Sequence, residues 1–349
     1  LKRIRETSSE IFRKAHFDLR SVKWTHKVSD RSTFERSRKE GGLRGQFVDD
    51  QENQETLFCV TDPNDELELE SQYIGTNKFY LMERLFRERA RGLNRVGGNW
   101  TAIALREPLK VRPITKGPKD SNAAFSDVQK TLWSALQKFD QFSLTAGTRP
   151  GPEVCDIFCK EYIKDALDEH SGVYGMKSGD FSAATNKLHR DCTLAAISGI
   201  RNPEVRALLT ENLCNGFVHN PVTGMSYPMS NGQLMGSLFS FPLLCVINLA
   251  VFRHAMEEWN GCKIPIHDLP VLVNGDDILF LCTERFEAFW RSKTTSAGLL
   301  PSLGKDYWST VFCMVNSIYM ALDPNDPRRI LGEVPYLNMG LYTGKKKGE

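Results

Sequence analysis

VLVNGDDILFL, residues 271–281, is the stretch that says most about which fold the chain adopts. Two apolar runs flank Asn274 and Gly275, which both tolerate positive φ, so the stretch predicts a β-hairpin with a tight turn. Asp276 and Asp277 then lie side by side at the tip of a hydrophobic hairpin. Buried carboxylate pairs cost free energy unless a cation holds them, and oxygen-only ligands favour Mg²⁺ or Mn²⁺. The tip is therefore either a solvated turn or a site for a divalent metal ion.

The composition is that of a globular protein with an uneven charge distribution. The 349 residues, 41% of them hydrophobic, suffice for two or three subdomains around a real core. Residues 83–119 carry ten Lys or Arg against three Glu, whereas residues 49–70 carry nine Asp or Glu and no Lys or Arg. The basic stretch suits a polyanion, and equally a solvated helix face followed by a loop. The nine scattered cysteines match no zinc framework and are expected to be reduced thiols, as in a cytosolic protein.

The first residue and one long uncharged stretch raise the questions of processing and of membrane insertion. The chain begins with Leu1 instead of Met, so we expect a fragment or a processed product. Residues 234–252 carry no charge and are long enough to cross a membrane. Gly236, Pro242 and Asn248 interrupt this stretch, which favours a buried core helix over a membrane anchor.

The order of elements predicts an α+β fold. Residues 101–116 look extended, and 311–320 look like a second hairpin. Helices are expected over 81–91, 122–142, 152–169, from 203 onward, about 240–259 and about 283–293. The second half therefore runs strand, helix, helix, hairpin, helix, hairpin, which differs from regular βαβ winding.

Asp180 is the candidate partner of the acidic hairpin. It follows VYGMKSG (173–179), a short strand, and precedes a helix start. Three carboxylates from two neighbouring strands can hold two metal ions roughly 3.5–4 Å apart, an arrangement suited to phosphoryl transfer. Because side chains alternate along a strand, we expect Asp276 to be the primary ligand and Asp277 the weaker one.

Two other segments suit phosphate or ribose. NGQLMGSLFSFP (231–242) is a Gly- and Ser-rich loop that feeds a helix, so its backbone N–H groups can approach a ligand closely. On that helix, Ser240 and Asn248 share one face, and Asn248 is either a reader of sugar hydroxyls or a core amide. In KVRPITK (110–116), alternating basic side chains suit a triphosphate, and equally a solvated strand edge. Those basic residues are Lys110, Arg112 and Lys116.

In this order, the motifs resemble a viral RNA-dependent RNA polymerase of the positive-strand type. The resembling segments are 110–116 (basic fingertip motif), 178–185, 232–242 and 274–277 (first three palm motifs), and 298–305 and 312–319 (the two that follow). The amino-acid sequences of these motifs most resemble those of the ourmia-like (botourmiavirus) group, which is related to narnaviruses, mitoviruses and RNA-phage replicases. The resemblance covers about residues 100–325.

The resemblance implies a right-hand polymerase with fingers, an antiparallel-sheet palm (RRM-like) and a thumb that is largely absent. The implied domains are an N-terminal extension with part of the fingers (1–99), fingers with the basic triphosphate-binding motif (100–170), a palm (171–325) with a finger insertion at about 190–230, and the start of a thumb or a tail (326–349). The implied activity is template-directed addition of ribonucleotides to an RNA 3′ end by a two-metal mechanism with Mg²⁺ or Mn²⁺.

The resemblance also implies roles for individual residues. Asp180 and Asp276 would bind the metal ions, Asp277 would assist, and Lys305 would protonate the leaving pyrophosphate as a general acid, unless it is simply a solvated turn lysine. Many relatives carry a second acid at the position of Asn186, where an amide can bind a ribose hydroxyl but adds no charge. The residues implied to bind the triphosphate are Lys110, Arg112 and Lys116, and those implied to read template or ribose are Ser237, Ser240 and Asn248.

The implied partners are an RNA template, nascent RNA, ribonucleoside triphosphates, and viral or host replication proteins. The expected location is the host cytoplasm or the mitochondrion. A reverse transcriptase would share the two-metal palm, but its acidic hairpin usually carries an aromatic residue where this chain has Asn274. A catalytically inactive, RNA-binding polymerase remnant is the alternative from another class.

Overall fold

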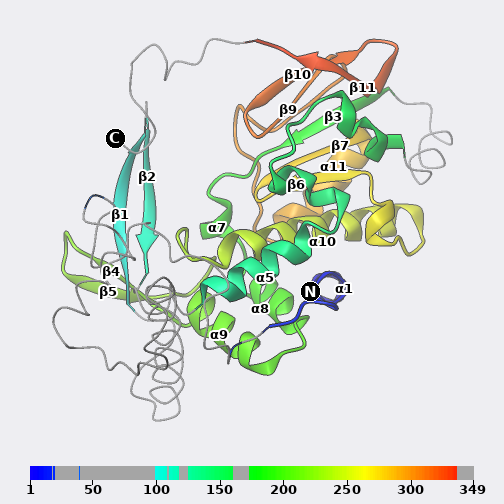
Figure 1. The fold of residues 1–349 in the computed structure, drawn as a ribbon. Helices are drawn as coiled ribbons and strands as arrows, with labels where there is room; N and C mark the ends of the chain where they lie inside the picture. Colours follow the sequence, from blue (N-terminus) through cyan, green and yellow to red (C-terminus); the bar gives the residue numbers. More distant parts are fainter. Residues whose placement is uncertain are drawn as a thin grey trace, which may run out of the picture.

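The structure is a computed structural model that describes residues 1–17, 19, 39, 99–107, 110–117, 125–159 and 173–335 (Figure 1). The helix predicted over 81–91 lies outside the described residues, as does most of the region assigned as an N-terminal extension. Of Lys110, only the backbone is described.

A four-stranded antiparallel sheet carries the first and third palm-like motifs. Its strands, in spatial order, are β6 (Val271–Asn274), β7 (Asp277–Thr283), β3 (Tyr174–Gly179) and β8 (Tyr307–Ser309). Along the chain, helices separate β3 from β6, and one helix separates β7 from β8, so the connectivity is that of the split β–α–β–β–α–β motif. The predicted α+β class with an antiparallel sheet is confirmed.

Both faces of this sheet are covered. Helices α10 (Ser240–Asn260) and α11 (Glu284–Ser296) pack on one face. The other face packs against a three-stranded sheet of β9 (Phe312–Val315), β10 (Ile318–Asp323) and β11 (Asp326–Glu333), with the 3₁₀ helix η3 (Pro152–Cys159) beside it (Figure 1). Ile278 and Phe280 of β7 face the helices, and Leu279 and Leu281 face the second sheet. Because residues 278–282 of β7 are all buried against one core or the other, this part of the strand is apolar throughout rather than alternating.

Several predicted helices are found, and one is shorter than expected. Asn202 caps α9 (Pro203–Cys214) through the N–H groups of Glu204 and Val205, as its Asn-Pro sequence predicts. The helix predicted over 122–142 is only α5 (Ser126–Leu136), because Phe139 takes an extended backbone and stacks on His267 with ring centroids 4.8 Å apart. The remaining short elements here are η2 (Asp140–Ala146), α7 (Ala184–Lys187), α8 (Arg190–Ser198) and η4 (Ile266–Asp268).

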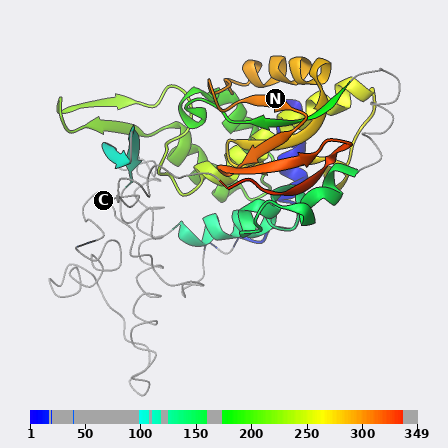
Figure 2. The same cartoon turned by 90° about the horizontal axis from the view of Figure 1, so that it is seen from above.

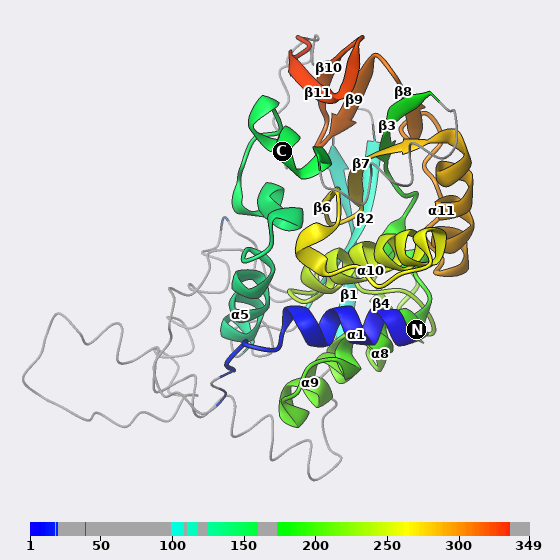
Figure 3. The ribbon, with the colours of Figure 1, turned by 90° about the vertical axis from the view of Figure 1, so that its right-hand side faces the viewer.

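The helix predicted over 152–169 is described only as far as residue 159, where it is the 3₁₀ helix η3 and not α-helix. An unexpected helix, α1 (Lys2–Ile11), lies alongside α10 (Figure 3). It buries Ile4 and Ile11 in the main core, and Glu10 accepts a 2.7 Å bond from the buried Arg253 of α10. The apolar stretch that could have crossed a membrane is thus the core helix α10, and none of the helices in the described ranges is long and apolar enough to span a bilayer.

A separate sheet carries the basic motif. Its order is β2 (Lys110–Lys116), β1 (Asn99–Glu107), β4 (Phe217–Asn220) and β5 (Met225–Pro228), with β1 and β4 parallel and the other pairs antiparallel. The β4–β5 hairpin extends away from the central sheet (Figure 2). One link to the body is a 3.1 Å bond from the Thr115 N–H to the Met235 carbonyl, beside Gly236. This link brings the basic strand to the Gly- and Ser-rich loop.

Gly236→Ala tests whether the lack of a side chain at residue 236 is what allows the Gly- and Ser-rich loop to lie this close to β2. Gly236 has φ +154°, and a Cβ there would lie 1.9 Å from the Thr115 carbonyl oxygen, so the strand must move. We expect the variant to lose about 2–3 kcal/mol of unfolding free energy, as overpacking does, measured by denaturant unfolding. Gly224→Ala is the matched control, because Gly224 also has positive φ (+70°) but nothing lies within 4 Å of its Cβ position. Equal losses in the two variants would contradict a close approach at Gly236.

Candidate functional site

Asp180 and the acidic hairpin lie at the same end of the central sheet. The last residue pair between β3 and β7 joins Gly179 to Ile278. Asp180 is the next residue after β3, and Asp277 is the first residue of β7, so the two aspartates stand next to each other on adjacent strands. The two strands are therefore neighbours, which is the condition that the two-metal hypothesis requires.

The hairpin turn is displaced by one residue from the predicted Asn-Gly turn. Asn274 pairs with Asp277 in the ladder, which leaves Gly275 and Asp276 as the two central turn residues. Only Gly275 has positive φ (+70°). The turn is supported from below by α10, because the Asn248 amide donates a 3.1 Å bond to the Gly275 carbonyl and the Gly275 N–H donates to the Cys245 sulfur at 3.1 Å.

The surroundings of the acidic tip disfavour the charged forms of its two carboxylates. Burial raises the pKa of Asp276, and the Asp180 carboxylate raises it further, while Arg112 and Lys305 lower it in part. Burial also raises the pKa of Asp277 to about 7, with the Asp276 and Asp180 carboxylates adding to the rise. The backbone N–H of Asn316 donates to the Asp277 carboxylate and partly offsets this. Asp180 therefore acts electrostatically on both hairpin aspartates.

Two cations reach this acidic group from different parts of the chain. The Lys305 ammonium lies 3.8 Å from one carboxylate oxygen of Asp180, and its side chain is 58% exposed. Arg112, on β2, is half-buried and near enough to Asp276 to affect its pKa. The structure thus brings together Asp180, Asp276, Asp277, Lys305 and Arg112.

The donor set fits a hard divalent cation in its chemistry. The carboxylates offer oxygen ligands only, and the pKa values of Asp276 and Asp277 are raised first by burial and then by neighbouring carboxylates, an environment in which a bound cation would favour the charged forms. However, within the described ranges no three His, Cys, Asp or Glu side chains are gathered closely enough to form a ready-made metal cluster. Like-charged carboxylates repel each other, so closing them around an ion requires the ion itself.

Three residues predicted to contact nucleotide or template are buried instead. The Ser237 hydroxyl donates to the Asn212 side chain at 2.6 Å, and the Ser240 hydroxyl donates to Gln233 at 3.0 Å. Asn248 is completely buried, and its amide supports the hairpin turn, so the core-amide alternative is the one that the geometry favours. In this conformation these side chains hold the Gly- and Ser-rich loop and the turn from within.

The other two predicted binding residues remain accessible. Asn186 is exposed on the short helix α7, where its backbone carbonyl lies under Gly232 of the Gly- and Ser-rich loop. Lys116 is half-exposed at the end of β2, next to Thr115, which bonds to that loop.

Three residues near the site were missed by sequence reasoning. Lys177 of β3 is fully buried, and its ammonium lies 2.9 Å from Asp306 and 2.7 Å from Glu287. A lysine within a short predicted strand was an available signal for Lys177, and adjacency to Lys305 was one for Asp306. Asn316 was placed in a hairpin turn, but only the fold shows that this turn meets the acidic tip, where the Asn274 amide donates to Asn316 at 2.6 Å.

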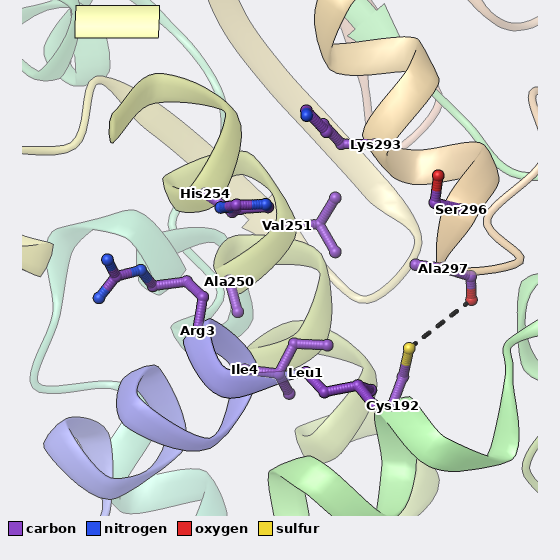
Figure 4. Close-up of a pocket in the computed structure, with 10 residues that line it drawn as sticks. All are labelled: Leu1, Arg3, Ile4, Cys192, Ala250, Val251, His254, Lys293, Ser296 and Ala297. Carbon is purple, nitrogen blue, oxygen red and sulfur yellow. Dashed lines mark hydrogen bonds between the residues drawn. The ribbon is translucent and has the colours of Figure 1, made fainter. Parts of the chain in front are cut away.

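A cavity of about 310 Å³ lies elsewhere, between α1, α8, α10 and α11 (Figure 4). Its walls include Leu1, Cys192, Val251 and Ala297, and the Cys192 thiol points to the Ala297 carbonyl at 3.9 Å. The acidic group lies apart from this cavity, at one end of the central strands β3 and β7.

The raised pKa of Asp277 predicts a pH dependence of the metal-free protein. The folded form holds this proton more tightly than the unfolded chain, whose pKa is about 4, so the stabilising contribution is complete below pH 4 and is lost as the pH rises through about 7. Between pH 5 and 8, with a chelator present, we expect the melting temperature of the wild type to fall about 5 °C more than that of Asp277→Asn.

Asp323→Asn is the matched control, because Asp323 is a half-buried carboxylate at the other end of β10, 3.8 Å from the exposed Arg329. This control should follow the wild type. A wild-type melting temperature that is flat from pH 5 to 8, or that changes in parallel with Asp277→Asn, would show that Asp277 ionises without cost.

Comparisons with known proteins agree with the sequence prediction. No family model matches the chain. Over 229 residues the chain is 36% identical to the RNA-dependent RNA polymerase of Ourmia melon virus (isolate Melon/Iran/VE9), a match that covers 60% of this chain and 26% of that protein. The chain thus spans about a quarter of the length of this curated relative. Its fold is similar to the crystal structure of an insertion loop deletion mutant of the RNA-dependent RNA polymerase of a human picorbirnavirus, with a TM-score of 0.50 and 14% identity over 67% of this chain and 46% of that one. The resemblance to viral RNA-dependent RNA polymerases of the ourmia-like group is confirmed.

Proposed function

We propose that this chain is the catalytic core of an RNA-directed RNA polymerase that replicates a viral genome by template-directed nucleotidyl transfer. The observation that carries the proposal is the convergence of Asp180, Asp276 and Asp277 with two cations at one end of an antiparallel sheet. Similarity to the Ourmia melon virus polymerase supports the same conclusion independently of the geometry.

The proposed subdomains follow from the sheets. The sheet β6-β7-β3-β8 with α10 and α11 would be the palm, and the sheet β2-β1-β4-β5 would belong to the fingers. Placing β4 and β5 in the fingers agrees with the predicted finger insertion at about 190–230, because both strands fall within it. The bond between Thr115 and Met235 would hold the fingers strand at the rim of the palm.

The substrates would be a ribonucleoside triphosphate and the 3′ end of an RNA paired to its template. Asp180 and Asp276, assisted by Asp277, would hold Mg²⁺ or Mn²⁺. When bound, these ions would supply the positive charge that makes a 3′ hydroxyl easier to deprotonate and that steadies the leaving oxygen. Lys305, whose exposed ammonium is next to Asp180, would donate a proton to the departing pyrophosphate.

The basic strand would bind the triphosphate. Arg112 is directed close enough to Asp276 to interact with it electrostatically, and a planar guanidinium can form two parallel hydrogen bonds with phosphate oxygens. Lys116, and Lys110 by its place in the motif, would add positive charge. Asn186 is exposed and could accept or donate a bond to ribose. Ser237, Ser240 and Asn248 would shape the loop and the turn rather than contact the substrate.

The proposed location is the host cytoplasm, where thiols stay reduced, as all eight described cysteines are. One observation favours the alternative of an inactive RNA-binding remnant: the described carboxylates do not form a ready-made metal cluster. Primer extension with Mg²⁺ or Mn²⁺ separates the two proposals, because a remnant would bind RNA without extending it.

Asp276→Ala should abolish nucleotide addition while leaving RNA binding nearly intact. The change removes a proposed metal ligand from the turn but no basic residue. We expect the rate of primer extension to fall by at least about a thousandfold, with the dissociation constant for a primer–template duplex changed by less than about twofold. Asp323→Ala removes a carboxylate at the far end of β10 and should keep the wild-type rate. Extension that survives in Asp276→Ala would contradict the metal assignment.

Arg112→Ala should raise the nucleotide KM more than it weakens template binding. Loss of charge-assisted bonds to phosphate predicts a KM about tenfold higher in steady-state extension assays. Arg106→Ala is the matched control, because Arg106 is exposed on the neighbouring strand β1 and should change KM little. Weaker template binding with an unchanged KM would instead assign Arg112 to the template.

A further inference from the structure

A buried ionic network lies directly behind the acidic group. Lys177 of β3 is fully buried, and its ammonium contacts Glu287 of α11 at 2.7 Å and Asp306 at 2.9 Å. Arg291, one turn after Glu287 on α11, pairs with Glu287 and, at 2.9 Å, with the same Asp306 oxygen. Two cations and two carboxylates balance in charge, so the group is stable only as a whole.

Asp306 is the member of this network that belongs to the loop carrying Lys305. Its carboxylate is only 2% exposed, whereas the Lys305 side chain is 58% exposed and Leu303 is fully exposed. Gly304 between them has φ +79°, and nothing lies within 4 Å of the place where its Cβ would be. The tip of the loop therefore has little packing of its own, and its nearest buried attachment is the side chain of Asp306.

The start of the same loop is tied to the residues around Asp180. The Ser302 N–H donates to the Asp180 carbonyl at 2.8 Å, and the Ser182 N–H donates to the Leu300 carbonyl at 2.8 Å. The loop is then closed by bonds from the N–H groups of Lys305 (3.2 Å) and Asp306 (3.1 Å) to the Ser302 carbonyl. Lys305 is thus held between a backbone attachment to the Asp180 segment and a side-chain attachment to β3 and α11.

We propose that Asp306 is a positioning residue, which, anchored by Lys177 and Arg291, places the Lys305 ammonium beside the Asp180 carboxylate. The proposal rests on the proposed function in one respect, namely that Lys305 acts on the leaving group. A general acid must lie within hydrogen-bonding reach of the group that it protonates, and a misplacement of about 1 Å can cost a hundredfold in rate. Asp306 itself, being buried, would not touch the substrate.

The first experiment measures position without activity. Carbodiimide joins a carboxylate to an amine in contact with it, and mass spectrometry of the digested full chain then quantifies the Asp180–Lys305 link. We expect this link in the wild type and at least a fivefold lower yield in Asp306→Asn. Asp323→Asn, the same change in an ion pair with the exposed Arg329 at the far end of β10, should keep the wild-type yield. An unchanged yield in Asp306→Asn would overturn the proposal.

The second experiment measures coupling in single-nucleotide addition. Asp306→Asn should lower the rate constant about tenfold, with the nucleotide KM changed less than twofold. In a Lys305→Ala background the same change should have no further effect, because the two residues would act as one unit. An equal loss in both backgrounds would show that Asp306 acts independently of Lys305, as a merely structural residue does, and would overturn the proposal.

Folding of Asp306→Asn is checked by its melting temperature. If that variant does not fold, Arg291→Gln replaces it, because the Arg291 side chain is 41% exposed and its loss leaves Lys177 on Asp306. This variant should lower the link yield and the rate constant in the same direction. A lowered link in a protein that adds no nucleotide would refute the proposed function but not the positioning. An unchanged link in an active polymerase would refute the positioning alone.

Discussion

Burial of two hairpin aspartates beside a third carboxylate is the constraint on which the rest of this structure depends. The register of β3 on β7 places Asp180 beside Asp277, and the tight turn adds Asp276, all in a partly buried position. Such an arrangement lowers the stability of the fold unless charge is supplied from outside. The protein supplies some of it, since Lys305 acts on both hairpin aspartates, Arg112 on Asp276 and the Asn316 N–H on Asp277, and the pKa of Asp277 remains near 7 even so. This cost at one end of the sheet supports the proposal that cations bind there.

The residues around the three carboxylates prevent the carboxylates from moving apart. β6 and β7 are packed on both faces, so the strands cannot slip in register without exposing apolar residues. Asn248 and Cys245 hold the Gly275 turn from α10, and the β9–β10 turn contacts it from the other side. Behind the carboxylates, an ionic network joins β3 to α11 and to the loop of Lys305; its members are Lys177, Glu287, Arg291 and Asp306. The unfavourable electrostatic energy is therefore concentrated in the three carboxylates, where a bound cation would lower it.

The sequence predicted what depends on local pattern and missed what depends on packing. Hairpins around 271–281 and 311–320, the Asn202 cap and the helix α10 all follow from local preferences, and they were found within a few residues. The turn at Gly275 was predicted one residue too early, because Asn-Gly and Gly-Asp are both acceptable turn pairs and the ladder decides between them. Ser237, Ser240 and Asn248 carry polar groups suited to a ligand, but burial, which no local pattern reveals, turned them inward. Lys177 and Asp306 lie 129 residues apart, so only the folded chain shows that they meet.

The most direct measurement is the diffraction of crystals that contain Mn²⁺ and a non-hydrolysable ribonucleoside triphosphate, with anomalous data collected at the manganese edge. We expect two anomalous peaks, each within coordination distance of at least one carboxylate among Asp180, Asp276 and Asp277. No peak at this end of the sheet at saturating Mn²⁺, or peaks only elsewhere on the chain, would show that these carboxylates do not bind the metal ions.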